Sequence, residues 1–173
     1  MRAQDQLIEE NIGLLWQGSD LLARLDDAAY VRIPSLLPPH RVGGHLRHCL
    51  ECYECFLDGV ERGAIDYDAR RRDPRLETRR EEAMMKILSL ADRLDALRYT
   101  ADRRVRVRME DAPAGIGEGG WLASTTAREL QVLRSHTVHH YALISMTLRA
   151  LGIHVDAGFG MAPSTIRHLR GAA

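Results

Sequence analysis

The chain has 173 residues, which is the size of one domain, because two independent cores would each fall near the lower end of the domain range. Lysine and arginine number 24, as do aspartate and glutamate, so the formal net charge is zero. A protein that binds nucleic acid through its phosphates needs an excess of basic side chains, so no nucleic-acid partner is expected. No apolar run approaches the roughly 18 residues of a membrane span, so no membrane partner is expected either.

The N-terminal segment and the cysteines indicate a cytoplasmic protein. Residues 1–7 contain no apolar stretch and carry an acid at Asp5, unlike a secretory signal peptide. Cys49, Cys52 and Cys55 lie within seven residues, and an odd, clustered set does not resemble the disulfide framework of a secreted protein. We therefore expect a reducing compartment.

Apolar residues at helical spacing predict two helices in the first part of the chain. The first covers residues 4–27, and the prolines between Pro34 and Pro39 interrupt the pattern that follows it. The second covers residues 41–60 and carries two neighbouring stripes. The apolar stripe comprises Val42, Leu46, Cys49, Tyr53, Phe56 or Leu57, and Val60. The second stripe comprises His45, His48, Cys52 and Cys55.

A polar linker and a third helix come next. Residues 61–73 are rich in arginine and predict a solvated loop. Asp73 offers a capping side chain and Pro74 suits the first helical position, so the third helix is expected over residues 74–98.

The hydrophobic period then changes from helix to strand. Residues 104–109 alternate between arginine and apolar side chains, as in a half-buried strand. Residues 111–120 contain a proline and four glycines and predict a turn, and residues 121–125 are expected to be the returning strand of a hairpin.

A fourth helix follows the hairpin. Thr126 and Glu129 fit a capping box, and Gly152 fits a C-terminal stop, so the helix is expected over residues 126–151. Residues 153–173 predict a tail that lies on the surface. Four helices of about 20–25 residues favour an all-α, antiparallel four-helix bundle, with the small hairpin inserted between helices three and four.

Five of the eight histidines fall in the second and fourth predicted helices. His136 and His140 are four residues apart, so their imidazoles project from one helix face, one turn apart. A helix supplies two nitrogen ligands to a metal ion with this spacing. A tight site needs a third ligand, and the second helix offers His45 or His48. Buried histidines are also often only hydrogen-bonded core residues, and this alternative stays open.

The cysteines and arginines have a structural interpretation beside a functional one. Cys52 follows His48 by four residues, so a histidine–thiolate site is conceivable, although cysteines are more often small buried hydrophobes. The arginine runs are expected to be solvated faces, with an anionic-substrate clamp at a pocket mouth as the alternative. These runs comprise Arg70 to Arg72, Arg79, Arg80 and residues 103–108.

Three segments resemble the DinB-like family. They are VGGHLRHCL at residues 42–50, ELQVLRSHTVHHYALI at 129–144 and GFGMAPST at 158–165. The resemblance implies a four-helix bundle, often dimeric, in which one histidine of the second helix and two of the fourth hold a divalent metal ion. Carried over, these are His48, His136 and His140, with His45 as the alternative second-helix ligand or as a partner behind a ligand.

The resemblance and the histidine pattern together define the functional hypotheses. Relatives in the family include thiol-dependent transferases and a thiol-dependent isomerase, which implies a small thiol and a small-molecule substrate. Three imidazoles leave open coordination positions and suit zinc, nickel or iron. The favoured hypothesis is therefore a metal-dependent enzyme, a thiol transferase or one with hydrolase-like activity, assembled as a homodimer. The alternatives are a non-catalytic metal- or small-ligand-binding bundle and a structural dimer whose histidines form a polar core network.

Glu129, about two turns before His136, is too distant to ligate but is a candidate for orienting a substrate amine.

Overall fold

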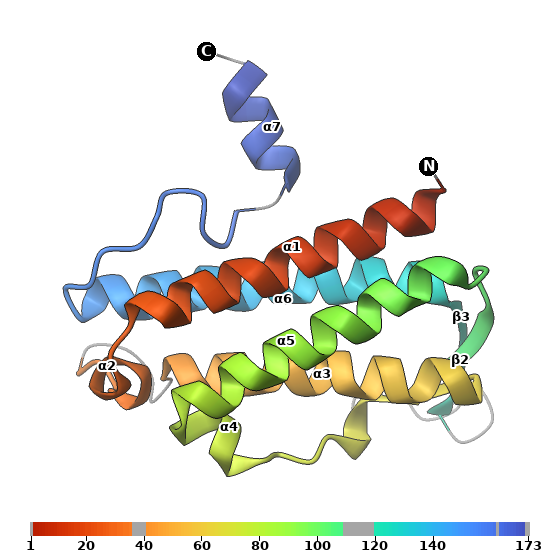
Figure 1. The fold of residues 1–173 in the computed structure, drawn as a ribbon, viewed down its shortest axis with the longest axis horizontal. Coiled ribbons are helices and arrows are strands. Elements are labelled where there is room, and N and C mark those ends of the chain that lie inside the picture. The colour runs from red at the N-terminus through yellow and green to blue at the C-terminus, as the bar shows by residue number, and fades with distance from the viewer. Residues whose placement is uncertain (1, 36–40, 109–119, 162, 172–173) are drawn as a thin grey trace.

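A computed structural model of the chain describes residues 2–35, 41–108, 120–161 and 163–171. The protein is mostly helical and carries one small three-stranded sheet, which confirms the predicted predominance of helix (Figure 1). Most of the predicted proline break and nearly all of the turn at 111–120 lie outside the described residues. Among the described residues, no helix combines the length and apolar character that crossing a membrane requires.

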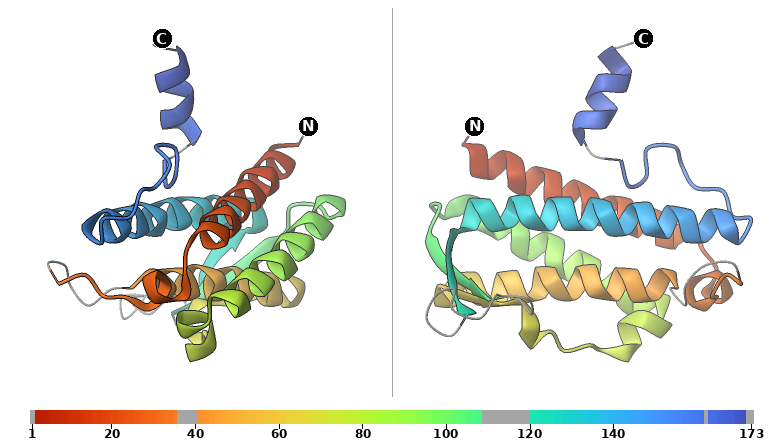
Figure 2. Two further views of the ribbon diagram at one scale, coloured as in Figure 1. Left: turned by 60° about the vertical axis from the view of Figure 1, so that its left-hand side comes forward. Right: turned by 180° about the vertical axis from the view of Figure 1, so that it is seen from behind.

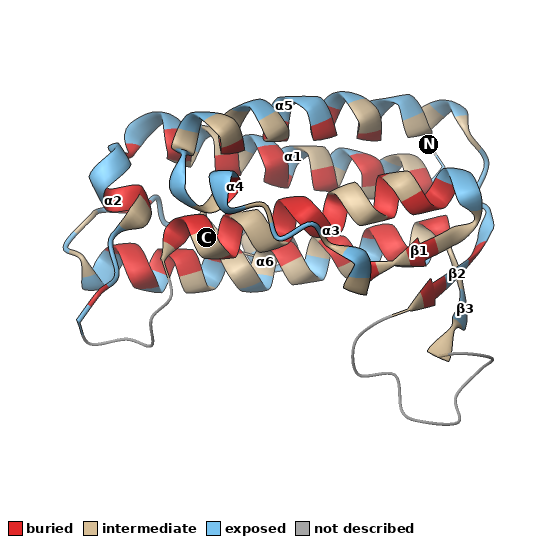
Figure 3. Ribbon diagram, turned by 90° about the horizontal axis from the view of Figure 1, so that it is seen from below, coloured by how far each residue is buried: buried red, intermediate tan, exposed pale blue. Residues whose placement is uncertain are grey.

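Four long helices form the body of the molecule. They are α1 (Ala3–Arg24), α3 (Val42–Arg62), α5 (Arg80–Ala96) and α6 (Thr126–Ala150). α1 and α3 each pack against both α5 and α6 (Figures 1 and 2). The buried residues lie on the inward faces of these helices, as the apolar stripes predict (Figure 3).

The first predicted helix is too long at its C-terminal end. α1 ends at Arg24, and a separate short helix, α2 (Asp27–Val31), follows it. The physical reason is a new helix cap, because the Asp26 side chain accepts a hydrogen bond from the backbone N–H of Ala29. A helix that covers residues 4–27 is therefore wrong at its last three positions.

The third predicted helix is two helices. Its start is confirmed, because the Asp73 side chain caps α4 (Pro74–Thr78) by accepting from the N–H of Arg75. The chain is extended at Arg79, with φ −121° and ψ 103°, and α5 begins at the next residue. This break lets α4 pack on α3. The hydroxyl of Tyr30 on α2 donates to the carbonyl of Leu76 on α4. Residues 97–99 form a short 3-10 helix rather than the end of α5.

The sheet contains the predicted hairpin and one unexpected strand. β2 (Arg104–Arg108) pairs antiparallel with β3 (Leu122–Thr125), which confirms the two hairpin strands. β1 (Ala64–Asp66) pairs parallel with β2, so the prediction of a solvated loop over residues 61–73 is wrong there. Ile65 is fully buried opposite Val107, and this burial outweighs the polar character of the surrounding segment.

The residue that caps the N-terminus of α6 (Thr126–Ala150) lies one position before the expected one. Thr125 rather than Thr126 is the cap, and its side chain accepts from the N–H of Arg128. Gly152 has the left-handed conformation, φ 75°, that a helix stop requires. The expected surface tail contains a helix, α7 (Pro163–Gly171), which projects from the body in all three ribbon views of Figures 1 and 2.

Candidate metal centre

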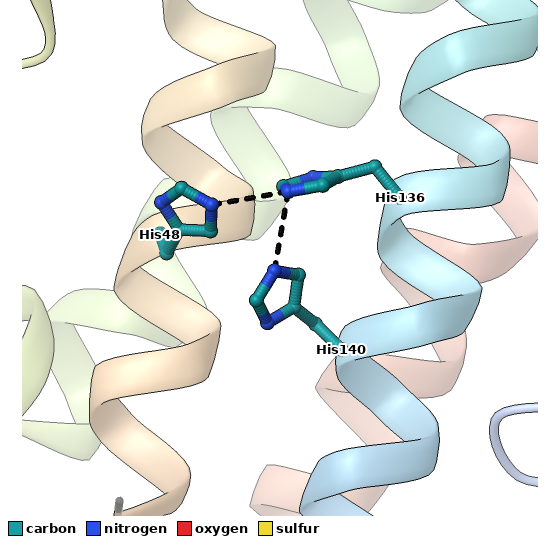
Figure 4. Close-up of side chains that lie close together, drawn as sticks. All are labelled: His48, His136 and His140. Carbon is teal, nitrogen blue, oxygen red and sulfur yellow. Dashed lines mark hydrogen bonds between the residues drawn. The ribbon is translucent and has the colours of Figure 1, made fainter. Parts of the chain in front are cut away.

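The three histidines meet between α3 and α6, which pack side by side (Figure 4). His48 projects from the second turn of α3, while His136 and His140 project from successive turns of α6. On α6 the buried Leu133, Thr137 and Ile144 share the inward side, so packing of that side turns both imidazoles toward α3. Local helix geometry therefore pairs two histidines, and helix packing adds the third.

Their ring nitrogens converge on one small volume. The Nε2 atom of His136 lies 3.0 Å from Nε2 of His48 and 3.1 Å from Nε2 of His140 (Figure 4). One ligand atom from each of the three residues lies within 4.8 Å of the others. Two nitrogens bound at about 2.0–2.1 Å to a tetrahedral zinc ion would lie roughly 3.3 Å apart. The spacing of the three residues is therefore compatible with a single metal ion.

The surroundings of the imidazoles favour their neutral form. Burial, and then the neighbouring imidazoles and arginines, lower the pKa of His48 to about 4. Burial and the adjacent histidines lower the pKa of His140 to about 3, and the pKa of His136 is lowered by burial as well. Near pH 7 the three rings are therefore neutral, which is the form that binds metal.

His45 occupies a different position from the other three. It is 8% exposed, and its Nδ1 atom lies 3.1 Å from Nδ1 of His140, on the side of that ring away from the convergence point. From this position His45 can hydrogen-bond to His140 and orient its ring toward the convergence point, as partners behind metal ligands commonly do. Of the two histidines left open by the sequence, the geometry thus favours His48 as the ligand from α3. His139, also on α6, is exposed, and the centroid of its ring lies 5.2 Å from that of His140.

The cysteines lie outside the group of potential ligands. Cys49 and Cys52 are buried and Cys55 is half-buried, and all three are free thiols. Burial raises the pKa of Cys52 to about 12 and that of Cys55 to about 11, so these thiols are protonated near pH 7. Among the described residues, the ligand group contains histidines alone, which supports the interpretation of the cysteines as small buried hydrophobes.

A cavity of about 280 Å³ adjoins the histidines. Its lining includes Arg41, Arg47, Glu77, His45, His48 and His140. The sequence analysis missed the two arginines and Glu77, although Arg47 stands next to His48 in the chain. The arginine runs that the sequence offers as an anion clamp are other residues, and several of them have partners within the protein. Arg70 donates to the carbonyl of Tyr67, Arg80 pairs with Asp27, and Arg108 pairs with Asp66.

Glu129 has a local structural role. It is buried, and its carboxylate accepts hydrogen bonds from the hydroxyls of Tyr67, at 2.9 Å, and Ser124, at 2.5 Å. These bonds tie the start of α6 to β3 and to the 3-10 helix Tyr67–Ala69. Both oxygens are thus engaged within the protein, and the suggested contact with a substrate amine has no support here.

Comparisons with known proteins identify no family. No family model matches the chain, and no solved structure matches it. Over 47 residues the chain is 43% identical to FK506-binding protein 5 of Rhizopus delemar (strain RA 99-880 / ATCC MYA-4621 / FGSC 9543 / NRRL 43880). The matched segment covers 27% of this chain and 12% of that protein. A likeness of this extent covers too little of either protein to assign a family or a function.

Proposed function

We propose that the chain is a DinB-like, metal-dependent enzyme that acts on a small molecule. In this proposal His48, His136 and His140 hold one divalent ion, which is zinc, nickel or iron. The observation that carries it is the convergence of three neutral imidazoles from two helices on one point. The long helices α1, α3, α5 and α6 would be the four helices of the bundle, with the sheet as an insertion.

The proposed reaction is transfer of a low-molecular-weight thiol to a small substrate. A bound divalent ion supplies Lewis acidity and lowers the pKa of a water or thiol in its open coordination positions. The protein's own part is to hold three imidazoles neutral and to provide space for a small molecule beside His48 and His140. Since burial raises the pKa of the Cys52 thiol and of the half-buried Cys55 thiol, the reacting sulfur would belong to a cosubstrate.

Metal analysis of purified variants tests the site. We expect about one divalent ion per chain in the unaltered protein, and loss of it in His48→Ala, His136→Ala and His140→Ala, because two imidazoles hold an ion too weakly to survive purification. His139→Ala is the matched control, since this exposed residue lies on the same helix, and it should retain the ion. His45→Ala should bind the ion more weakly, by about 10–100-fold, as expected for loss of an orienting partner.

The measurement is elemental analysis by mass spectrometry together with a chelator competition titration. An ion retained in full by His136→Ala, or lost equally in His139→Ala, would refute the proposed ligand set. Circular dichroism of each variant separates loss of metal from loss of fold.

A further inference from the structure

The cavity beside the three histidines has a chemistry of its own, separate from metal binding. It lies at the N-terminal end of α3, where Arg41 and Gly44 line it, and reaches His48 and His140. Its volume of about 280 Å³ is close to the lower limit of ligand pockets, roughly 300 Å³. A molecule that fills it would therefore be small and would touch the imidazoles at one end.

The charged lining of the cavity is positive in balance. Arg41 and Arg47 face a single carboxylate in the lining, that of Glu77. Arg47 donates to Glu77 at 2.6 Å, and the Nε atom of Arg41 lies 3.1 Å from the other oxygen of the same carboxylate. Two guanidinium groups thus share one carboxylate, which leaves an excess of one positive charge.

Arg47 also has an unused donor. Its Nε atom is buried and has no hydrogen-bond partner within the described parts of the chain. A guanidinium presents its N–H groups as a planar fork that matches the two oxygens of a carboxylate. A buried guanidinium donor without a partner costs free energy.

The contacts of Glu77 show that these two arginines bind a carboxylate. Its carboxylate, carried by the short helix α4, bridges Arg41 and Arg47 as a ligand carboxylate would. Because Glu77 competes with any incoming anion for the same donors, removing its charge should strengthen anion binding.

We infer that this cavity binds a small carboxylate, which Arg47 and Arg41 hold at one end while the other end of the molecule faces His48 and His140. The inference deepens the proposed function, on which it rests for the role of the ligand, because it makes the small substrate or thiol a carboxylic acid. Recognition of the carboxylate itself depends on the arginines and not on the metal ion.

Isothermal titration calorimetry with three matched probes tests the inference. The probes are 3-mercaptopropionate, which has a thiol and a carboxylate, 2-mercaptoethanol, which has the thiol and an uncharged hydroxyl in place of the carboxylate, and propionate, which has the carboxylate without the thiol. With zinc-loaded protein we expect 3-mercaptopropionate to bind at least about tenfold more tightly than 2-mercaptoethanol, as a charge-assisted hydrogen bond predicts. Arg47→Gln should reduce this difference, because only Arg41 remains to hold the carboxylate, and should leave the affinity for 2-mercaptoethanol unchanged.

Two further variants keep the test independent of misfolding. Arg62→Gln changes an exposed arginine at the far end of the same helix and should preserve the difference between the probes. Glu77→Gln should raise the affinity for propionate severalfold, a gain that a damaged fold would not produce. Equal affinities of the two thiols, an unchanged preference in Arg47→Gln, or no gain in Glu77→Gln would each overturn the inference.

The same titrations separate this inference from the proposed function. The thiol contribution is the difference between 3-mercaptopropionate and propionate, and it should vanish when the metal is removed. Absence of that contribution would contradict the thiol-dependent function. Binding of propionate to the metal-free protein, weakened by Arg47→Gln, would still support the carboxylate site.

Discussion

At the scale of single residues, the imidazole cluster is held in a form that suits metal binding. His48 and His140 have pKa values of about 4 and about 3, because burial disfavours the charged ring and the neighbouring rings add to this effect. In the unfolded chain the same groups titrate near 6.5. The folded protein without metal therefore binds fewer protons than the unfolded chain between these limits.

This difference predicts how the stability of the metal-free protein depends on pH. Because the pKa of His48 is lower in the folded protein than in the unfolded chain, its neutral ring contributes stability above about pH 6.5. This contribution is lost as the pH falls toward about 4. We expect the free energy of unfolding in urea to decrease between about pH 7 and about pH 5, a window that lies above the titration of most carboxylates. The loss should be smaller in His48→Gln. An equal slope in this variant would show that His48 is not held neutral by the fold.

At the scale of elements, α3 supplies the metal-ligand candidate His48 and four of the residues that line the adjoining cavity, His48 among them. The packing of α3 on α4 decides where Glu77 lies. Gly43 is the contact point between these helices. A Cβ atom there would overlap the carbonyl oxygen of Glu77 and would lie 2.9 Å from a ring carbon of Tyr30. At Gly44, by contrast, the nearest atom would be a flexible side-chain carbon of Arg41 at 3.6 Å, an ordinary contact.

These neighbouring glycines form a matched pair for a test of the α3–α4 contact. Gly43→Ala should lower the free energy of unfolding by about 1–3 kcal/mol, because the backbone of α4 must move to accept the methyl group. Gly44→Ala should change it by less than about 1 kcal/mol, in either direction. Urea denaturation of both variants measures the difference, and equal stabilities would contradict the close approach of the two helices.

At the scale of the whole molecule, the expected homodimer remains a proposal. The large apolar side chains of Trp16 on α1 and Met146 on α6 are 44% and 56% exposed, so both helices offer apolar surface to a second copy. A formal net charge of zero gives two copies little mutual repulsion.

Light scattering during size-exclusion chromatography tests this proposal directly. We expect a mass of twice the 19.5 kDa of one chain, maintained across micromolar concentrations. A mass of one chain throughout that range would exclude a stable dimer. Measurements at low and high salt form the control, because an apolar interface should hold in both.

The sequence by itself determined the features that depend on local geometry. The positions of the long helices follow from apolar spacing, and the pairing of His136 with His140 follows from the 3.6-residue turn. The hairpin strands follow from strict alternation of side chains. Each of these depends on residues a few positions apart, so no knowledge of distant contacts is needed.

Only the tertiary structure decided the features that depend on distant partners. The position of His48 at the convergence point, with His45 behind His140, depends on how α3 is rotated toward α6. The strand at Ala64–Asp66 exists because β2 offers it a partner, although the segment that follows it is polar and rich in arginine. The bridge from Arg41 through Glu77 to Arg47 exists because the chain breaks at Arg79 and α4 folds against α3. Packing between elements outweighs local preference at these places, because the buried area that it gains is not encoded in any short segment.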